Sequence, residues 1–355
     1  MRMARGLVQW ASLLTLGMLV VGCSEYRTVD IHDVQIVMTE DGRVVRVVGK
    51  GFTAYQEVIE RSPNVKSVTR MTDLKGDREP NEFSISPDGQ SLVYAAMELK
   101  SRPYYWNLYR ISTSGSAGVT NVTNGRYYDL QPTFDPTGQF VFFASNRSSP
   151  LLKVCRVALT GAGGITRITQ SDSDDRWPDV TPDGKEIYYS SRPMNAMDMQ
   201  IWRATIVGNL PTQLREGWRP RLSPDGSKVL YCAKDLKSEL SKIWVMGVDG
   251  TNQTEFIADP KADERDPAWS PDGSKIVFAS NAGKDSNGWK NYDIWIMNAD
   301  GSSITQLTTN GSADLAPEFS PDGKHIYFLS NRGFFWDIWR MEIAEDPASA
   351  ASPQA

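Results

Sequence analysis

Acidic side chains recur at one register of a repeated sequence pattern. Asp129, Asp175, Glu264 and Asp314 each lie seven residues before the proline of a tetrapeptide that occurs six times, and Glu79 lies one residue from that register in another copy. Carboxylates that converge on one point repel each other unless a cation, an arginine or backbone amides meet them. Such a group would form an acidic cup for a basic peptide segment or for calcium, which prefers oxygen ligands. The calcium candidates are Asp129, Asp175 and Asp314.

Arginine and aromatic residues are interleaved with these acids. They are Arg126, Tyr127, Arg176, Trp177, Trp218, Arg219 and Arg265. Both kinds of residue are enriched at protein interfaces, so the same register favours a protein partner. Two hypotheses are open for the carboxylates: they receive a binding partner, or they bond to the backbone and to neighbouring repeats and hold those repeats in register.

The tetrapeptide predicts the turn that organises each repeat. Its copies cover residues 86–89, 135–138, 181–184, 223–226, 270–273 and 320–323. An oxygen-bearing side chain comes first, proline with its fixed φ second and glycine last, which favours a type I turn between antiparallel strands. Successive turn prolines are 49, 46, 42, 47 and 50 residues apart.

Further β patterns follow each turn. An apolar run predicts a second strand at residues 92–95, 140–144, 187–190, 229–232, 276–279 and 326–329. A third strand carries an aromatic residue at one register, as at Trp202 and Trp295, which suggests packing between repeats. The fourth strand is short and rich in threonine, as at residues 119–123. The last repeat lacks this strand, and residues 68–72 carry its pattern ahead of the first repeat.

These patterns predict an all-β fold, a six-bladed β-propeller over residues 65–344 that is closed by the N-terminal strand near residue 68. In such a ring the innermost strand of each blade borders the axis, so the acidic register would form a ring at one mouth. Aromatic residues in two long loops are candidates for recognising a peptide or a sugar. They are Tyr104, Tyr105, Trp106 and Trp289.

Several motifs resemble the WD40-like repeats of the TolB propeller family. They are the Ser-Pro-Asp-Gly turn, the Ser-Asn-Arg at residues 145–147 and 330–332, and the Asp-Ile-Trp at residues 293–295 and 337–339. The resemblance implies a binding protein of the bacterial envelope, because TolB receives the peptidoglycan-associated lipoprotein Pal at a channel mouth of this kind. Residues 24–64 form a much shorter segment than the α/β domain that precedes the propeller in TolB and is implicated in contacting TolA.

The N-terminal residues resemble the leader of a bacterial lipoprotein. Arg2 and Arg5 precede an apolar run, which is typical of a signal peptide over residues 1–22. Small residues then lead to Cys23, which looks like a lipidated first residue; several acyl chains anchor stably, since each buried methylene adds about 0.8 kcal/mol. Ser24 follows it, and by the enterobacterial sorting rule this implies an outer-membrane lipoprotein that faces the periplasm. The alternative is an ordinary secretory leader with an incidental cysteine.

Charge and cysteine content narrow the partners. Without the two arginines of the leader, the formal charge of −5 becomes −7, so nucleic acid is not an expected partner. Cys155 and Cys232 fall at different strand positions of non-neighbouring repeats, and we expect buried free thiols rather than a disulfide.

Two segments flank the predicted ring. Residues 23–64 contain a predicted β-hairpin, with strands over residues 34–38 and 44–48. Thr53 and Gln56 then predict the capped start of a short helix that ends near Pro63. At the other end of the chain, residues 345–355 predict a disordered tail.

Enzymatic chemistry finds little support in the sequence. The two histidines are His32 and His325, and no Gly-x-Ser-x-Gly elbow occurs, so neither a Ser-His-Asp triad nor a His-rich metal site is expected. The leading prediction is a lipid-anchored, non-enzymatic propeller without a required cofactor, which binds an envelope protein, Pal-like by resemblance, at an acidic mouth. The alternative is a glycan-binding or polysaccharide-degrading propeller that uses the aromatic loops.

Overall fold

The computed structural model describes the propeller and the backbone of three N-terminal strands. The described residues are 62–74, 77–99, 102–114, 118–160, 164–194, 196–235, 237–256, 259–283, 290–333 and 335–344, with the backbone of 34–38, 44–49 and 52–54. Contacts divide the chain into two compact units, Met1–Gln56 and Glu57–Ala355. Every regular element in these ranges is a β-strand, and no helix in them is long and apolar enough to cross a membrane.

The first unit contains a small antiparallel sheet in the order β1-β2-β3. Its strands are β1 (Val34–Met38), β2 (Val44–Gly49) and β3 (Phe52–Ala54), and β1 with β2 confirms the predicted hairpin. Thr53 pairs with Val48 inside β3, so the prediction that it caps a helix is wrong: the edge of β2 offers this segment strand pairing instead. The predicted leader, Cys23 and the tail over residues 345–355 lie outside the described residues.

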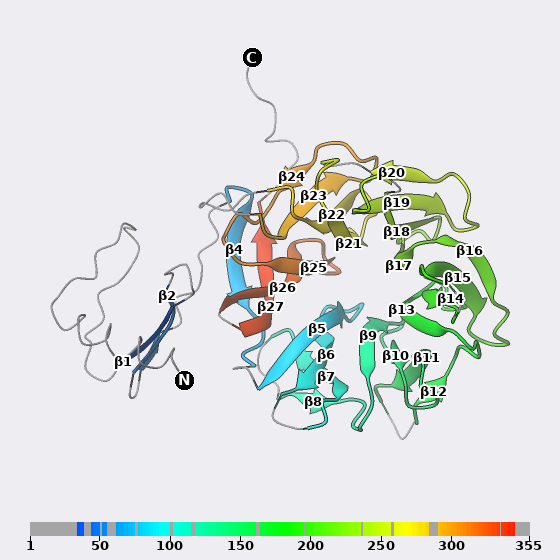
Figure 1. The fold of residues 1–355 in the computed structure, drawn as a ribbon, viewed down its shortest axis with the longest axis horizontal. Helices are drawn as coiled ribbons and strands as arrows, with labels where there is room; N and C mark the ends of the chain where they lie inside the picture. The colour runs from blue at the N-terminus through cyan, green and yellow to red at the C-terminus, as the bar shows by residue number, and fades with distance from the viewer. Residues whose placement is uncertain are drawn as a thin grey trace, which may run out of the picture. The chain divides into compact units, whose positions relative to one another are not determined.

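The second unit is a ring of six four-stranded antiparallel sheets (Figure 1). Blade 1 contains β5 (Arg78–Ile85), β6 (Ser91–Glu98), β7 (Trp106–Ser112) and β8 (Thr120–Asn121). Blade 2 contains β9 (Asp129–Phe134), β10 (Phe140–Ser145), β11 (Lys153–Ala158) and β12 (Thr166–Arg167). Blade 3 contains β13 (Asp174–Val180), β14 (Glu186–Arg192), β15 (Gln200–Thr205) and β16 (Thr212–Glu216).

The other half of the ring repeats this arrangement. Blade 4 contains β17 (Trp218–Leu222), β18 (Lys228–Lys234), β19 (Ser241–Gly247) and β20 (Thr254–Phe256). Blade 5 contains β21 (Glu264–Trp269), β22 (Lys275–Ser280), β23 (Asp293–Asn298) and β24 (Thr305–Gln306). Blade 6 contains β25 (Asp314–Phe319), β26 (His325–Gly333), β27 (Phe335–Ile343) and, from the start of the propeller, β4 (Val65–Arg70).

Strand order within the blades confirms the predicted propeller and its closure. In each blade the strands run in order from the axis outward, so β5, β9, β13, β17, β21 and β25 surround the axis (Figure 1). Blade 6 has the order β25-β26-β27-β4, with Trp339 of β27 opposite Arg70 of β4. The N-terminal strand therefore supplies the outermost strand of the last blade.

The Ser-Pro-Asp-Gly turns also connect neighbouring blades. In blade 1 the N–H of Gly89 donates to the carbonyl oxygen of Ser86 at 2.8 Å, and Gly89 has a φ of 70°. A Cβ atom added at Gly138 would lie 3.4 Å from Pro87, and one at Gly89 would lie 3.6 Å from Pro321 of blade 6. An added Cβ would lie within 4 Å of the turn proline of the preceding blade at five of the six turn glycines, and Gly184 is the exception.

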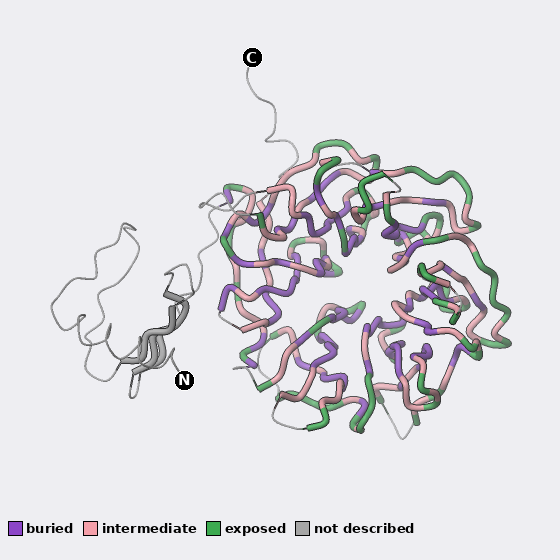
Figure 2. Tube along the Cα trace, viewed as in Figure 1, coloured by how far each residue is buried: buried purple, intermediate pink, exposed green. Residues whose placement is uncertain are grey.

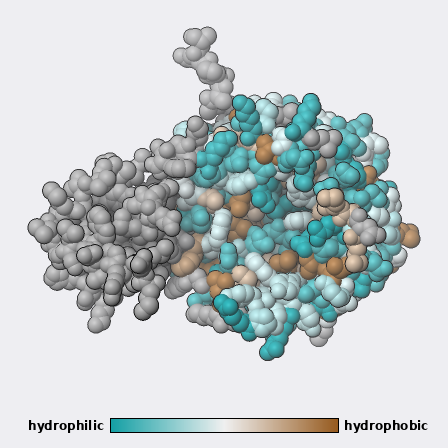
Figure 3. Space-filling model, viewed as in Figure 1, coloured by the Kyte–Doolittle hydropathy of each residue, from teal (hydrophilic) through white to brown (hydrophobic). Residues whose placement is uncertain are grey.

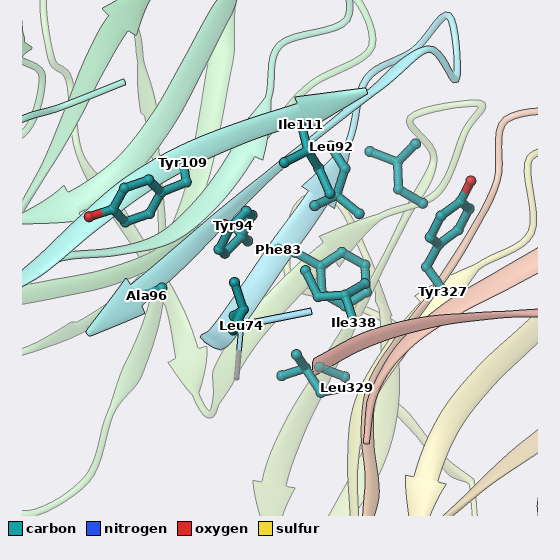
Figure 4. Close-up of a cluster of buried hydrophobic side chains, with 12 residues drawn as sticks. Leu74, Phe83, Leu92, Tyr94, Ala96, Tyr109, Ile111, Tyr327, Leu329 and Ile338 are labelled. Carbon is teal, nitrogen blue, oxygen red and sulfur yellow. The ribbon is translucent and has the colours of Figure 1, made fainter. Parts of the chain in front are cut away.

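The core fills the spaces between neighbouring blades, where the middle strands are mostly buried (Figure 2). One cluster joins the first blade to the last: Tyr94 and Phe83 of blade 1 pack with Tyr327 and Ile338 of blade 6 (Figure 4). Burial of one such large side chain stabilises by about 1.5–3 kcal/mol. The junction at which the two ends of the propeller meet is therefore packed as a continuous core.

The two cysteines of the propeller belong to this core. Cys155 and Cys232 are buried and free, as predicted. Burial raises the pKa of the Cys155 thiol to about 11 and that of Cys232 to about 12, so both thiols stay protonated at neutral pH.

Asp337 of β27 fixes the end of the closing strand. Its carboxylate accepts hydrogen bonds from the Arg70 guanidinium at 2.5 Å, the Thr72 hydroxyl at 2.7 Å and the Leu74 N–H at 3.0 Å. Asp337 has no exposed surface, whereas Asp73, which lies 3.1 Å from the same arginine, has a side chain that is 46% exposed. One buried carboxylate thus fastens the residues that follow β4 to the last blade.

Replacement of Asp337 by alanine should loosen the ring at its closure. Asp337→Ala removes the buried acceptor of Arg70, the Thr72 hydroxyl and the Leu74 N–H, and we expect a loss of about 3–5 kcal/mol in the free energy of unfolding. Asp73→Ala removes the exposed ion pair of the same arginine and should cost about 0–1 kcal/mol. Urea unfolding measures both losses, and hydrogen exchange should accelerate in β4 only for Asp337→Ala. Equal losses in the two variants would contradict this role.

Candidate functional site

A β-bulge interrupts the innermost strand of each blade, where its pairing with the second strand shifts. The residue five positions before the turn proline lies within the bulge in five blades, at Gln131, Trp177, Arg219, Asp266 and Ala316, and in blade 1 the same register is Glu82, which follows the bulge and pairs with Ala95. All of them except Glu82 have a positive φ, between 48° and 57°. A bulge bends its strand and re-aims a side chain. We call these six residues the axial ring.

Proline follows the bulge residue in five of the six blades, at Pro132, Pro178, Pro220, Pro267 and Pro317. The innermost strand has an open edge, and proline leaves no unpaired N–H there. A positive φ at a non-glycine residue costs about 1–3 kcal/mol and persists where the surrounding structure imposes it. Its repetition around the ring indicates that the bulge serves to direct these side chains.

Side chains of the axial ring bond to each other across the axis. The Arg219 guanidinium donates to Glu82 Oε1 at 3.0 Å and lies 2.9 Å from Asp266 Oδ1. The Trp177 indole N–H donates to the same Glu82 oxygen at 2.8 Å, and the Ala316 N–H donates to Asp266 Oδ2 at 3.1 Å. Blade 1 and blade 4 lie opposite each other in the ring (Figure 1), so the contact between Arg219 and Glu82 spans the axis.

A second level of polar contacts lies two residues further along the innermost strands. Arg221 lies 3.5 Å from Glu318, and Asp179 accepts a hydrogen bond from the Leu222 N–H at 2.7 Å. A pocket of about 20 Å³ remains beside these contacts, which is room for one water-sized group. It is lined by Glu82, Phe83, Gln131, Pro132, Trp177, Pro178, Arg219, Pro220 and Arg221. Polar contacts between the innermost strands of different blades thus occur at two levels, and the contact between Arg219 and Glu82 at the first level spans the axis.

Burial acts differently on the two acids that share Arg219. Burial raises the pKa of Glu82, although Arg219 and the Trp177 hydrogen bond oppose this shift. Burial also opposes ionisation of Asp266, but Arg219 and Arg265 outweigh it, so the pKa of Asp266 is lowered. Nearby cations and the Ala316 N–H together favour the ionised form of Asp266, whereas burial prevails at Glu82.

The four acids predicted to line the mouth have relative exposures of 0–1%. They are Asp129, Asp175, Glu264 and Asp314. Asp129 accepts from Arg147 at 2.5 Å, and Asp314 accepts from Arg332 at 2.7 Å. Both arginines belong to the Ser-Asn-Arg motifs and to the same blade as their acid.

The other two acids have similar surroundings. Asp175 accepts from the hydroxyls of Ser171 at 2.6 Å and Ser191 at 2.7 Å, and Glu264 lies 3.9 Å from the Lys242 ammonium of blade 4. The contact of Glu264 with Lys242 joins two blades, as the second hypothesis proposes, whereas the Arg147, Arg332 and Ser191 contacts hold each acid within its own blade. The acidic cup is therefore not formed by these four residues, because their carboxylates are buried and face partners in the blades.

The predicted calcium site would use three of these acids. Across the described ranges, no group of three or more His, Cys, Asp or Glu side chains is placed to hold a metal ion. Asp129, Asp175 and Asp314 belong to three different blades and each has its own partners. They do not form a common calcium site.

The remaining predicted mouth residues divide into two groups. Trp177 and Arg219 belong to the axial ring. The others are exposed or half-buried around the starts of the innermost strands, and we call them the mouth rim: Glu79, Arg126, Arg176, Trp218 and Arg265. The Arg265 side chain is 45% exposed, and its guanidinium lies 5.7 Å from the Tyr292 ring. Figure 3 shows mainly hydrophilic side chains around the centre of the ring on the face in view.

The aromatic loop candidates are less exposed than predicted. Trp106 is the first residue of β7 and packs against the core cluster between blades 1 and 2, so it does not belong to a loop surface. Tyr104 and Tyr105 are half-buried, and Trp289 lies outside the described residues. Tyr127, one of the residues interleaved with the acids, is 37% exposed. Its neighbour Tyr128, which sequence reasoning did not select, is 44% exposed.

Sequence reasoning also missed most of the axial ring, namely Glu82, Gln131, Asp266 and Ala316. A signal was present, because proline follows this register in five of six repeats. Proline inside a strand marks an edge or a bulge, and both apply here. The acidic register two residues earlier gives a stronger sequence signal, because its residue types are more alike.

Comparison with known proteins gives one family and several similar folds. A family model described as the TolB β-propeller domain matches residues 64–256 and 217–354. A protein from Agrobacterium tumefaciens assigned as TolB is 21% identical over 76% of this chain and 90% of that chain, with a TM-score of 0.55. TolB from Acinetobacter baumannii is 18% identical over 76% of this chain and 65% of that chain, with a TM-score of 0.54.

A solved enzyme structure has a similar fold. Oligogalacturonate lyase from Vibrio parahaemolyticus is 14% identical over 81% of this chain and 98% of that chain, with a TM-score of 0.54. At such identities these likenesses concern the fold alone. A search of curated proteins gives no match.

Removal of the shared arginine should destabilise the ring. Arg219→Ala leaves Glu82 and Asp266 buried without their common cation, and we expect a loss of about 3–5 kcal/mol in the free energy of unfolding. Arg265 lies 3.5 Å from the same Asp266 but is half-exposed, so Arg265→Ala should cost about 0–1 kcal/mol. Urea unfolding at neutral pH tests the difference, and a loss for Arg219→Ala as small as that of the control would refute the bridging role.

The two acids of the axial ring should give opposite pH dependences. Because the folded-state pKa of Glu82 is raised above 4.5, wild-type protein should lose stability relative to Glu82→Gln as the pH rises above 4.5, with a constant difference below it. Because the pKa of Asp266 is lowered below 3.8, wild-type protein should lose stability relative to Asp266→Asn as the pH falls below 3.8. Unfolding free energies across this range measure both differences. Differences of the same sign for the two acids would contradict the opposite pKa shifts of Glu82 and Asp266.

Proposed function

Because the chain belongs to the TolB β-propeller family, we propose that it is an envelope protein that binds a protein partner at the mouth of its ring. In this proposal the predicted lipid on Cys23 anchors it, preferably to the outer membrane with the propeller facing the periplasm. A Pal-like lipoprotein is the partner suggested by the resemblance to the TolB propeller.

The observation that carries the proposal is the mouth rim around a bridged axis. Arg126 and Arg265 are exposed and Arg176 and Trp218 are half-buried, and arginine and tryptophan are the residue types that dominate binding energy at interfaces. Since Arg219 and Glu82 bridge the axis below them, a partner meets a floor of side chains and binds by surface contact. The accessible charges of the rim are mainly arginines, which favours acidic and aromatic side chains on the partner.

Binding explains the described residues better than catalysis does. Arg219 of the axial ring forms ion pairs with Glu82 and Asp266, so the charges of these groups stabilise one another. His325 lies 3.8 Å from Asp322 of a surface turn, at the end of blade 6 opposite the mouth. The likeness to oligogalacturonate lyase concerns the fold, and it brings no residue of that enzyme to this chain.

A second candidate function rests on two exposed aromatic residues. Tyr127 and Tyr128 precede β9 at the same mouth and are 37% and 44% exposed. The Arg147 guanidinium lies 4.8 Å from the Tyr127 ring and holds one of its faces. Adjacent exposed rings of this kind suit a glycan, which gives the same mouth an alternative ligand.

Photo-crosslinking from the mouth should distinguish the two candidates. A photoreactive amino acid at Trp218 should crosslink one defined envelope protein in intact envelopes, whereas the same group at Lys185, which follows a turn at the opposite end of blade 3 and is 79% exposed, should not. Arg176→Ala with Arg265→Ala should lower the yield about tenfold, the effect of 1.4 kcal/mol.

The other outcomes are equally specific. Crosslinking to polysaccharide that disappears with Tyr127→Ala would favour the glycan-binding candidate and reject the protein partner. Equal protein crosslinking from Trp218 and Lys185 would show that the mouth has no special role. A purified Pal-like protein that binds wild-type protein but not the double arginine variant in calorimetry would identify the partner class.

A further inference from the structure

One oxygen of the Glu82 carboxylate lacks a partner. Oε1 accepts from both Trp177 and Arg219, whereas Oε2 is buried and accepts no hydrogen bond. Glu82 as a whole is 8% exposed and lines the axial pocket. A buried acceptor without a donor is costly, so Oε2 marks a position at which a donor is missing.

The donors that line the pocket already have other acceptors: the Trp177 indole and Arg219 donate to Oε1, and Arg221 lies 3.5 Å from Glu318. Pro132, Pro178 and Pro220 line it from three successive blades, and proline has a carbonyl oxygen but no N–H. The side-chain oxygen of Gln131 accepts from the backbone N–H of Trp177 at 3.2 Å. The pocket therefore suits a small group that donates hydrogen bonds.

Charge around the axis favours a cation. Four carboxylates, Glu82, Asp179, Asp266 and Glu318, face three guanidinium groups, Arg219, Arg221 and Arg265. The pocket lining itself holds one carboxylate and two guanidinium groups, but Arg219 also pairs with Asp266 and Arg221 with Glu318, so the whole set carries one excess negative charge. Burial raises the pKa of Glu82. A positive group at Oε2 would offset that burial by favouring the ionised form.

We propose that the axial pocket is a subsite for a primary ammonium group, supplied by a lysine side chain of the bound partner. An ammonium is a compact point charge with three donors, which suits a single unpaired oxygen, whereas the planar guanidinium of arginine is built to bond to both oxygens of a carboxylate. This inference rests on the proposed function, and it deepens it. The partner segment would present a lysine to Glu82, with acidic or aromatic neighbours facing Arg176 and Arg265 of the mouth rim.

The Trp177 indole N–H provides a direct reporter, because it donates to the same carboxylate. Its signal in ¹⁵N-tryptophan-labelled protein can be assigned among the 11 tryptophans by Trp177→Phe. The probes are Nα-acetyl-lysine amide, its Nε-acetylated form, which has a similar shape without the charge, and methylammonium chloride, with sodium chloride matching ionic strength. We expect a saturable shift of the Trp177 signal with the lysine probe and with methylammonium, and none with the acetylated form.

Two glutamine variants locate the effect. Glu82→Gln should abolish the shift, whereas Glu318→Gln, which alters a half-buried axial glutamate outside the pocket lining, should retain it. No saturable shift in wild-type protein means that water fills the pocket and overturns the proposal. An equal shift with the acetylated probe does the same. A response to methylammonium alone would assign the pocket to a free amine and overturn insertion of a lysine.

The outcome is separable from that of the proposed function. The titration of wild-type protein uses small probes and needs neither a partner nor a variant that folds. Crosslinking from Trp218 without any probe response would reject the lysine subsite and leave the mouth as an interface. A probe response without crosslinking would reject the partner interface and, with it, the lysine donor proposed here.

Discussion

Pairing of β4 with β27 is the interaction on which the ring depends. It places the first strand of the propeller in the last blade, so the outer edge of β27 is paired and the ends of the chain segment are joined. Asp337 fastens this pairing through Arg70, Thr72 and Leu74. Only in a closed ring do the innermost strands face one another, which brings Arg219 to Glu82 across 137 residues of sequence.

Convergence of six strands on one axis creates a polar problem that the bulges solve. The axial ring contributes one residue from each blade, and the residue type differs at all six positions. Arg219 then bonds to acids from two other blades, while Trp177 donates to Glu82. A buried ion pair adds little net stability over apolar packing, but loss of one member is costly, so the network fixes how the innermost strands meet at the axis more than it strengthens the fold.

The sequence was sufficient for the fold because its signals are local: a turn tetrapeptide, β patterns after it and an orphan strand pattern near Val68 that the last repeat lacked. The site depends on a bulge, and one extra residue moves a side chain to the other face of a strand. Asp129 and Asp314 therefore turn into their blades, toward Arg147 and Arg332, although all four residues were conspicuous in the sequence. Pairing each acid with the Ser-Asn-Arg of its own repeat would have predicted this arrangement.

The contact between Arg219 and Glu82 has a mechanical consequence. A closed ring of blades deforms most easily into an oval. A contact that spans one diameter, which we call a brace, resists elongation along that diameter. At 3.0 Å, this pair braces the diameter through blades 1 and 4. Protonation of a single glutamate weakens the brace, so the roundness of the propeller is coupled to the charge on Glu82.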